Sequence, residues 1–434
     1  MILLLAAAAF GEPLTVMSAI DRALASNPVI AQAALAEQIA AIRLTRARLD
    51  RIGLTLGANA GSSERVTAPL DGASSFDAQS AFWDFRGTAV LPLYQGGAIG
   101  AQIDLAAANA AGSIATRRIS QRDIAESVVL AYWNLQGFEL QHEAAEEALL
   151  VTQEALAIIA SRAAAGLAAQ IDVNRSKVDV FQQEAELLEL LSGRSRARQE
   201  LARLLHLPVD EISLSEPVPS LSAPRAVVGV GDGSARLEIA RLEGERAAAQ
   251  AGVRLARSAA LPQVALTGDV GLGAVALGGG TSNALFPAPT FDSGDLVPAL
   301  DAGVGVGLSW TPFDLFRTRQ DVQIAELAVR QTEAALLSQE DAVRQEAANA
   351  VSRLETSRLQ AEFAAEQLTL ARDNLQIIQD LYSQGNTTIL ELFNAQASFR
   401  AARSQAARVA VDLVSAEWSL RFALGTDPVT ESEP

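Results

Sequence analysis

The sequence predicts a mainly α-helical protein that also carries membrane-spanning β-strands, built from a unit of two strands and two long helices that occurs twice. The first observation is the repeat itself: Pro92 and Pro312 are 220 positions apart, and Gly166 and Gly385 are 219 apart. The second is that two pairs of short segments alternate apolar with small or polar residues. The third is that each pair precedes a long stretch with helical periodicity and many Ala residues.

The chain begins with a short apolar run over residues 1–12, which is similar to the end of a signal peptide but lacks its basic segment. We expect the first repeat to occupy residues 13–205. Within it we expect a helix, then a β-hairpin at 52–93, and then a long helical hairpin at 98–205.

The second repeat follows a linker. Residues 206–234 are rich in Pro, Gly, Ser and Val, which favours an irregular segment with short pieces of strand or helix. We expect the second repeat at 235–425, with a helix, a β-hairpin at 263–311 and a long helical hairpin at 318–424. The acidic end, residues 426–434, is expected to be a loose tail.

Four segments keep a period of two over about ten residues, the length of a tilted strand across a membrane. These segments are 52–60, 82–93, 263–273 and 300–310. The residues between the strands of each pair, 61–81 and 274–299, are rich in Gly, Ser, Pro and Asp and are expected to form exposed loops. Four strands cannot close a barrel, and an open sheet edge is not tolerated in lipid. Several chains must therefore share one barrel if these strands span a membrane.

Two tryptophans lie in these strand segments. Trp83 and Trp310 are candidates for anchors at the membrane interface, where Trp is enriched. The spacing is equally compatible with two core tryptophans, so the alternation by itself leaves both interpretations open.

The long stretches 98–164 and 318–383 contain no Pro, and at about 1.5 Å per residue each reaches roughly 100 Å as a helix. The stretches 169–205 and 388–424 return from a Gly in each repeat, and Gly is the residue that a tight helix-ending turn favours. Many apolar positions are Ala, whose small side chain allows helices to approach closely and suits a thin wall of helices. An ordinary antiparallel coiled coil would show the same periodicity.

The composition excludes several classes of protein. The 434 residues carry a net charge of −17, which argues against a nucleic-acid partner because phosphate binding needs Lys and Arg. The absence of Cys excludes disulfides, thiolate metal sites and Cys nucleophiles. The only two His residues, His142 and His206, lie 64 positions apart in helical stretches, so no His-rich metal site and no cofactor is expected. No nucleophile–base set or phosphate loop is recognisable, so the sequence does not predict an enzyme.

Short motifs mark the junctions between the expected elements. They are Asn27-Pro28 after the first helical turns, Pro92-Leu93-Tyr94-Gln95-Gly96-Gly97 after the second strand, Tyr382-Ser383-Gln384-Gly385, and the segment Ile389–Gln396, whose first-repeat counterpart is Ala165-Gly166 followed by Ile171-Asp172-Val173. With these motifs in this order, essentially the whole chain resembles the TolC family of outer-membrane efflux proteins. One departure is Leu315-Phe316-Arg317, which stands where the first repeat has Gln95-Gly96-Gly97.

The resemblance implies a homotrimer located in the cell outer membrane and extending into the periplasm. Three chains would contribute a 12-stranded β-barrel held in outer-membrane lipid, continued by a long periplasmic α-helical barrel. The implied function is a passive exit duct of a tripartite efflux or type I secretion system. It would work with an inner-membrane pump and a periplasmic adaptor (membrane fusion) protein. The sequence does not indicate the transported substrate.

The resemblance also implies roles for residues at the helical turns. The turns at Gly166 and Gly385, with Ile171 and Ile389, would form the periplasmic tip and the docking surface for the adaptor. These turns would also form the closed end of the duct.

Four residues near those turns match gating positions of the family. Glu391 would contribute to an acidic ring that constricts the pore, and Asn394 stands where the family often has a second acid. Tyr382 and Asp172 match partners whose hydrogen bond helps to hold the tip closed. The basic residue that the family places just after the second-repeat Gly is absent, because Asn386 follows it.

Two other functional classes remain as alternatives. A periplasmic coiled-coil adaptor or binding protein of an export system would explain the long helices but not the four lipid-length strands. An enzyme would require catalytic groups that the sequence does not show. The exit duct is therefore the favoured prediction.

Overall fold

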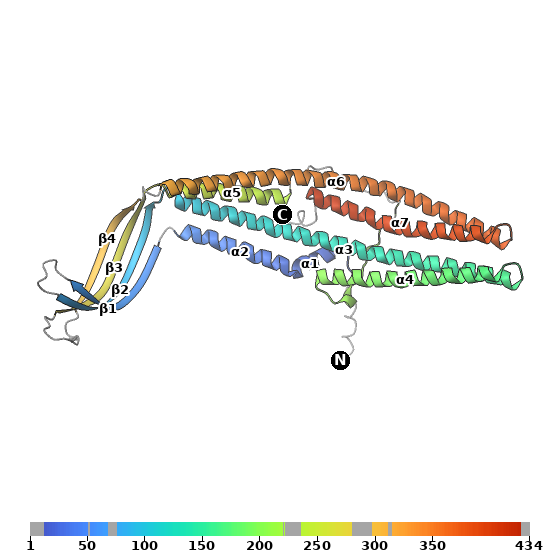
Figure 1. Cartoon of the computed structure of the whole chain (residues 1–434), viewed down its shortest axis with the longest axis horizontal. Helices are drawn as coiled ribbons and strands as arrows, with labels where there is room; N and C mark the ends of the chain where they lie inside the picture. The colour runs from blue at the N-terminus through green and yellow to red at the C-terminus, as the bar shows by residue number, and fades with distance from the viewer. Residues whose placement is uncertain are drawn as a thin grey trace, which may run out of the picture. The chain divides into compact units, whose positions relative to one another are not determined.

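The computed structural model describes residues 13–50, 53–67, 76–219, 221, 236–279, 297–310 and 315–426. Within these residues the chain forms long helices and one sheet of four antiparallel strands (Figure 1). It divides into two compact units, one made of Met1–Glu37, Ser113–Leu242 and Ala335–Pro434, the other of Gln38–Gly112 and Glu243–Ala334. The expected signal segment at 1–12 and almost all of the expected acidic tail lie outside the described residues.

The sheet belongs to the second unit. Its strands β1 (Gly53–Thr67), β2 (Phe76–Tyr94), β3 (Gln263–Gly279) and β4 (Val297–Ser309) pair in chain order. The prediction of long loops at 61–81 and 274–299 is wrong in part, because the ladders continue to Thr67–Phe76 and to Val275–Val297. Pairing satisfies the backbone N–H and C=O groups whatever the side chains are, so a Gly- and Ser-rich composition does not end a strand.

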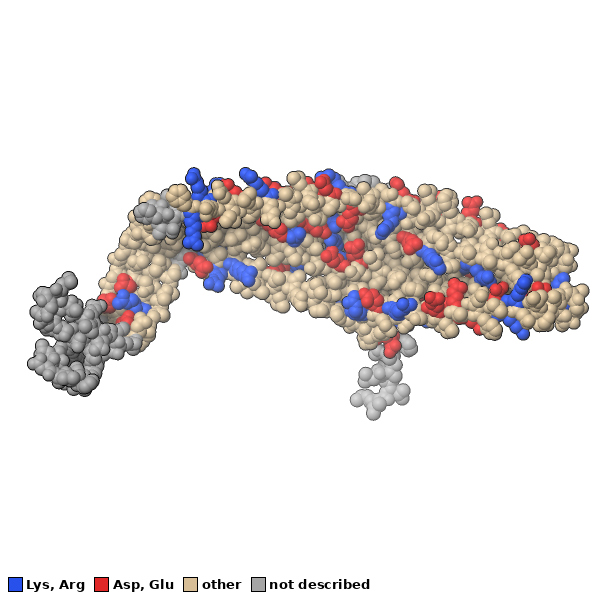
Figure 2. All heavy atoms as spheres, in the orientation of Figure 1, with Lys and Arg blue, Asp and Glu red and all other residues tan. Residues whose placement is uncertain are grey.

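The sheet has one apolar and one polar face, as the alternation predicts. Leu54, Leu56 and Val304 lie on the apolar face and are 72%, 80% and 82% exposed in the single chain. On the side shown in Figure 2 the sheet is mostly uncharged, apart from one small group of charged residues. Large apolar side chains left in water at this density require a covering, and lipid supplies it for a membrane-spanning sheet.

The helices are α1 (Val16–Ser26), α2 (Pro28–Leu49), α3 (Ala98–Ala164), α4 (Gln170–Leu205), α5 (Leu237–Ser258), α6 (Leu315–Ser383) and α7 (Ile389–Leu424), with a 3-10 turn η1 at Val209–Glu211. The single helix expected at the start of the first repeat is two helices. Asn27 is extended there, its side chain accepts a hydrogen bond from the Val29 N–H at 2.9 Å, and Pro28 starts a new helix because Pro is favoured in a first turn. No helix among the described residues is long and apolar enough to cross a membrane.

The core of the first unit consists of three apolar clusters. One gathers around Tyr132 and Trp133 of α3 and includes residues of α1, α4 and α7. The Tyr132 hydroxyl donates to the Leu14 carbonyl at 2.9 Å and accepts from the Glu216 N–H at 3.2 Å, which ties the chain start and the linker to α3. The second cluster joins α6 to α7. The third joins α3, α4, α6 and α7 near their turns, and it positions the candidate site.

Candidate functional site

The turns between α3 and α4 and between α6 and α7 have the same backbone geometry. Gly166 and Gly385 have φ angles of 76° and 80°, in the left-handed region that favours glycine. The N–H of each Gly donates to the carbonyl three residues earlier at 3.0 Å, and the next N–H donates to the carbonyl five residues earlier at 2.8 Å. This is the Schellman arrangement that ends helices. Both glycines therefore reverse the chain, as the sequence predicts.

The two returning helices begin differently. At α7 the hydroxyl of Thr388 accepts a hydrogen bond from the Glu391 N–H at 3.4 Å, whereas α4 begins at Ala169 without a side-chain cap. Asp172 and Glu391 occupy the same position of the two repeats, 219 residues apart, in the first turn of each helix. A carboxylate is favourable there because the helix N-terminus carries partial positive charge.

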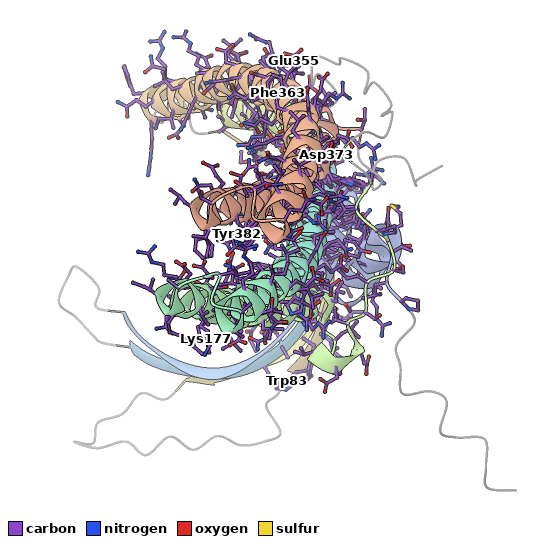
Figure 3. The ribbon with its side chains drawn as sticks, turned by 90° about the vertical axis from the view of Figure 1, so that its right-hand side faces the viewer. Trp83, Lys177, Glu355, Phe363, Asp373 and Tyr382 are labelled. Carbon is purple, nitrogen blue, oxygen red and sulfur yellow. The ribbon has the colours of Figure 1, made fainter. Side chains whose placement is uncertain are left out.

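Tyr382 lies inside the cluster that joins the two hairpins. Its side chain is 4% exposed and packs with Leu392 and Phe399 of α7 and Ile159 of α3. In Figure 3 it lies on the side of the α6–α7 hairpin that faces the α3–α4 hairpin. The packing in this cluster fixes how the two turns sit against each other.

The hydrogen bond that the family resemblance implies between Tyr382 and Asp172 is not present in this chain. The half-buried Asp172 acts on Tyr382 through its charge. Burial raises the pKa of the Tyr382 phenol, the Arg162 charge lowers it and the Asp172 charge raises it, and the net direction is upward. Tyr382 therefore stays neutral at physiological pH. Further from the turns, Glu147 of α3 pairs with Arg372 and Arg403 at 3.0 and 2.7 Å, and beside the turns the polar contact is a different one.

That contact comes from Arg162, which the sequence did not single out. Its Nη1 donates to the Tyr382 carbonyl at 2.8 Å and to the Ser383 carbonyl at 3.3 Å. Its guanidinium carbon lies 4.9 Å from the centre of the Tyr382 ring. The only signal in the sequence is a basic residue in the last turn of α3. Such a residue normally interacts with the last carbonyl groups of its own helix, so a partner 220 positions away was not predictable.

Glu391 and Asn394 form a separate group. Both side chains are exposed, whereas Leu392, Ala395 and neighbouring residues of α7 face the cluster. The two polar residues lie three positions apart and so share one face of the helix. Both residues are exposed in the single chain, as residues that line a wider assembly would be.

The two isoleucines expected at the docking surface differ in their exposure to solvent. Ile171 is 59% exposed, but Ile389 packs partly against the cluster, and its neighbour Leu390 is 62% exposed instead. Leu390 is also the repeat counterpart of Ile171 at the 219-residue offset. The helix phase at the start of α7 turns Ile389 toward the cluster and Leu390 outward, and a docking role for Ile389 stays a prediction.

The polar face of the sheet carries a charged row. Arg86 of β2 lies 3.7 Å from Asp301 of β4 and 3.7 Å from Asp84. The register places Gly271 of β3 between Arg86 and Asp301, and a Cβ at Gly271 would collide with the Asp301 carboxylate. The missing side chain thus lets an ion pair cross β3. Charged groups on this face suit a water-filled interior.

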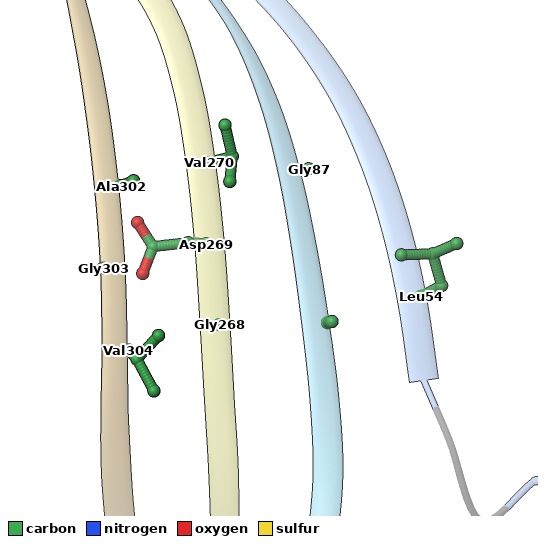
Figure 4. Close-up of a pocket in the computed structure, with 9 residues that line it drawn as sticks. Leu54, Gly87, Gly268, Asp269, Val270, Ala302, Gly303 and Val304 are labelled. Carbon is green, nitrogen blue, oxygen red and sulfur yellow. The ribbon is translucent and has the colours of Figure 1, made fainter.

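The apolar face is shaped by glycines too. Gly87 and Gly268 lie in a shallow hollow of about 480 Å³ whose lining includes Leu54, Val304 and also Asp269 (Figure 4). No group of three or more His, Cys, Asp or Glu that could hold a metal ion occurs in the part of the chain that the structure describes.

A four-stranded sheet with an apolar outer face and a charged inner face, joined to duplicated hairpins of long helices, defines a membrane-channel subunit. The chain belongs to the outer membrane efflux protein family, whose model matches residues 19–206 and 234–426. It is therefore an exit duct of the outer membrane that extends into the periplasm, in a family of channels and not of enzymes. Because the chain belongs to this family, the alternative hypothesis of a periplasmic coiled-coil adaptor is rejected.

Individual relatives are distant. The chain is 25% identical over 372 residues to the pyoverdine export outer membrane protein OpmQ of Pseudomonas putida, covering 85% of this chain and 73% of OpmQ. The outer-membrane channel OprN has a similar fold, with a TM-score of 0.80, 22% identity, and coverage of 95% of this chain and 90% of OprN. The outer membrane protein VceC of Vibrio cholerae has a TM-score of 0.78 at 21% identity, covering 94% of this chain and 96% of VceC.

Proposed function

We propose that three copies of this chain assemble into one duct and that the helical turns form its gated end. The observation that carries the proposal is the pair of free edges of the sheet. Within the described residues, β1 and β4 each pair on one side only. In lipid an unpaired strand edge leaves backbone N–H and C=O groups without partners, so β1 of one copy must pair with β4 of the next.

The helices support the same head-to-tail contact. Apolar side chains that are more than half exposed follow α6 at Leu359, Phe363, Leu370 and Ile377, and follow α4 at Ile171, Val178, Phe181 and Leu188. Figure 1 shows α6 and α4 on the two sides of α7 and α3. Two different apolar stripes on opposite edges favour a heterologous contact, which closes into a ring when the rotation is right.

The α6 edge also has room for a partner. Phe363 and Leu370 of α6, with Ser398 and Ala401 of α7, line a groove of about 690 Å³. Phe181, which is 66% exposed on α4, has the size and chemistry to fill part of such a groove in the next copy. Burying these stripes would remove exposed apolar surface of α4 and α6 from water.

The two tryptophans support a position in the membrane. The register places Trp83 level with Pro298 of β4, and Trp310 stands twelve positions later, directly after the last residue of β4. Twelve residues of strand measure about 40 Å, which a tilt of about 40° reduces to about 30 Å along the membrane normal. That height equals the hydrocarbon thickness, so we assign Trp83 and Trp310 to the two interfaces.

The turns supply the gate and the docking surface. Three copies would bring three Glu391 side chains around one axis, beside Asn394, where mutual repulsion favours bound cations. The exposed apolar residues Leu167, Ile171 and Leu390 would meet the periplasmic adaptor, which connects the duct to an inner-membrane pump. Tyr382 and Asp172 belong to the closed arrangement through packing and charge.

The test measures assembly and conductance together. Detergent-extracted protein should have the mass of three chains and form cation-favouring steps in a planar bilayer. Phe181→Glu and Phe363→Glu each place a charge in the proposed contact and should yield monomers without conductance. Leu150→Glu, at an equally exposed apolar residue of α3, is the control and should leave the trimer intact. A wild-type protein that stays monomeric in detergent and conducts nothing would refute the proposal.

The relative OpmQ makes pyoverdine the first cargo to test. Expression of this chain in a strain that lacks its own pyoverdine export channel should restore secretion if the cargo is shared. Accumulation of pyoverdine in the periplasm despite a correctly inserted trimer would assign a different cargo without affecting the duct.

A further inference from the structure

Arg162 joins two parts of the chain that lie 220 positions apart. It extends from the last turn of α3 to the end of α6, where one Nη1 donates to the carbonyls of Tyr382 and Ser383 at 2.8 and 3.3 Å. These carbonyls belong to the last turn of α6, beyond the helix's own ladder of hydrogen bonds, and Arg162 is a second donor to the Tyr382 carbonyl beside the Gly385 N–H at 3.0 Å. A guanidinium is well suited to them because the helix C-terminus carries partial negative charge.

The contact has a second component. The Arg162 guanidinium lies over the Tyr382 ring, with 4.9 Å between its central carbon and the ring centre. A lysine ammonium is a compact point charge, and it cannot lie over the ring with a planar group while also donating to both carbonyls. Arg162 is half-buried, and its Nε lies without a hydrogen-bond partner among the described residues. The guanidinium is thus directed to the α6 end rather than to other acceptors.

The contact is not duplicated. The 219-residue offset that relates Gly166 to Gly385 places Leu381 at the position of Arg162. Arg162 of α3 therefore contacts the end of α6, but α6 has no arginine at the equivalent position that could contact the end of α3. A Cβ at Gly385 would lie 3.6 Å from Arg162 Nη2, an ordinary van der Waals contact, so this position needs glycine for its positive φ and not for space. The second-repeat turn, which lacks a basic residue of its own after Gly385, takes its positive charge from the first repeat.

We propose that Arg162 is the clamp that holds the two hairpin turns of each chain together and so keeps the helical end of the duct narrow. The clamp rests on the proposed function, since a narrow end has meaning only in the shared duct. Arg162 acts as a positioning residue: it sets where α6 and α7 end relative to α3 and α4. Parting the turns requires the guanidinium to leave two carbonyls and a ring at once, in each of three chains.

The test uses a substitution that keeps the charge. Arg162→Lys preserves the net charge at the tip and removes the fork, and Arg175→Lys makes the same change at an exposed position of α4. Since the chain has no Cys, Ala165→Cys and Gln384→Cys can carry two spin labels, one in each turn. Chains bearing the pair are diluted with unlabelled chains, so that distances are measured within single chains of full-length trimers.

We expect Arg162→Lys to broaden and lengthen the distance between the labels and to raise the conducting fraction in bilayers at least about tenfold, as loss of a charge-assisted hydrogen bond implies. Arg175→Lys should change neither. Arg162→Gln serves as a second variant if the lysine variant is not stable, and it should act in the same direction.

Each other result overturns the clamp. Label distances in Arg162→Lys that match the wild type would show that the two turns are held without this contact. Lengthened distances with unchanged conductance would show that parting the turns does not open the duct. A wild-type protein that forms no trimer and no steps would refute the proposed function instead, and the label distances would still decide whether Arg162 holds the turns.

Discussion

His206 and Gly425 end α4 and α7 at equivalent positions of the two repeats, and both have left-handed backbone angles, with φ of 52° and 72°. His206 is the only described non-glycine residue with positive φ. Its neighbour Leu207 donates to the Ala202 carbonyl at 3.0 Å, as Thr426 does to Arg421. The first repeat thus carries a histidine in the strained position that a glycine fills in the second.

This difference predicts opposite effects of two substitutions. His206→Gly should raise the free energy of unfolding by about 0.5 kcal/mol, because relief of strain exceeds the entropy that Gly adds to the unfolded chain. Gly425→Ala should lower it by about 1 kcal/mol. Urea unfolding of the solubilised protein, followed by circular dichroism, measures both. Equal effects of the same sign would contradict the prediction.

Gly96 and Gly97 follow β2, and we expect their substitution by Ala to lower stability by different amounts. Both have positive φ, at 59° and 87°. A Cβ on Gly96 would lie 2.8 Å from the Ser258 backbone carbonyl, whereas a Cβ on Gly97 would have nothing within 4 Å. Gly97→Ala should therefore cost about 1 kcal/mol of strain, and Gly96→Ala about 2–3 kcal/mol, because backbone must also move. Thermal unfolding compares them, and equal midpoints would show that the close approach is not rigid.

Glu238 predicts an acid-sensitive contribution to stability. Burial raises its pKa, but hydrogen bonds from Arg236 and the charge of Arg122 outweigh burial and lower the pKa to about 2 from 4.5. A depressed carboxyl pKa stabilises the fold above pH 4.5, and this stabilisation is lost as the pH falls toward 2.

Glu238→Gln should therefore lower stability at pH 7 and flatten the loss of stability between pH 4.5 and 2. Glu126 nearby has a pKa raised by burial, so its own contribution runs in the opposite direction and is lost as the pH rises. Glu200→Gln is the control, because Glu200 pairs with Arg203 on the surface, where ion pairs contribute little. Denaturant midpoints across this pH range test it, and parallel pH curves for Glu238→Gln and wild type would contradict it.

Glu391 predicts a selectivity change that depends on position and not on charge alone. Asp412 is exposed on the same helix, three heptads and roughly 30 Å further from the turn. In a salt gradient, Glu391→Gln should move the reversal potential of single channels toward zero, and Asn394→Asp should move it away from zero. Asp412→Asn should have a smaller effect, since the duct is expected to be narrowest at the turns. Equal shifts for Glu391→Gln and Asp412→Asn would contradict the proposed acidic ring at Glu391 but not the proposed duct.

The ends of the long helices were predicted closely from the sequence, and the ends of the strands were predicted less closely. The ends of α3, α4, α6 and α7 lie within three residues of the expected positions, because periodicity, Pro and Gly act locally. β1 to β4 extend beyond the alternating segments, since a strand continues wherever a neighbour supplies hydrogen bonds. Cross-strand partners are distant in sequence and leave no local signal.

Some features of the candidate site were predictable from the sequence, and others were not. Gly166 and Gly385 were predictable because a left-handed turn has a residue preference of its own. The Tyr382–Asp172 hydrogen bond was expected and is absent, whereas Arg162 was unexpected and makes the contact. Ile389 is partly buried and Leu390 is 62% exposed, which shows that the helix phase at the start of α7 decides which of two neighbouring side chains faces outward.

By itself the sequence determined the duplication, the long helices and the positions of the turns, because each depends on local periodicity. From backbone hydrogen bonding it also predicts that several chains share the strands. Only the tertiary structure decided which side chain joins the two hairpins, which apolar stripes stay uncovered and how far the sheet extends. Those features depend on contacts between residues up to 220 positions apart, and such contacts are set by packing geometry, which no local pattern encodes.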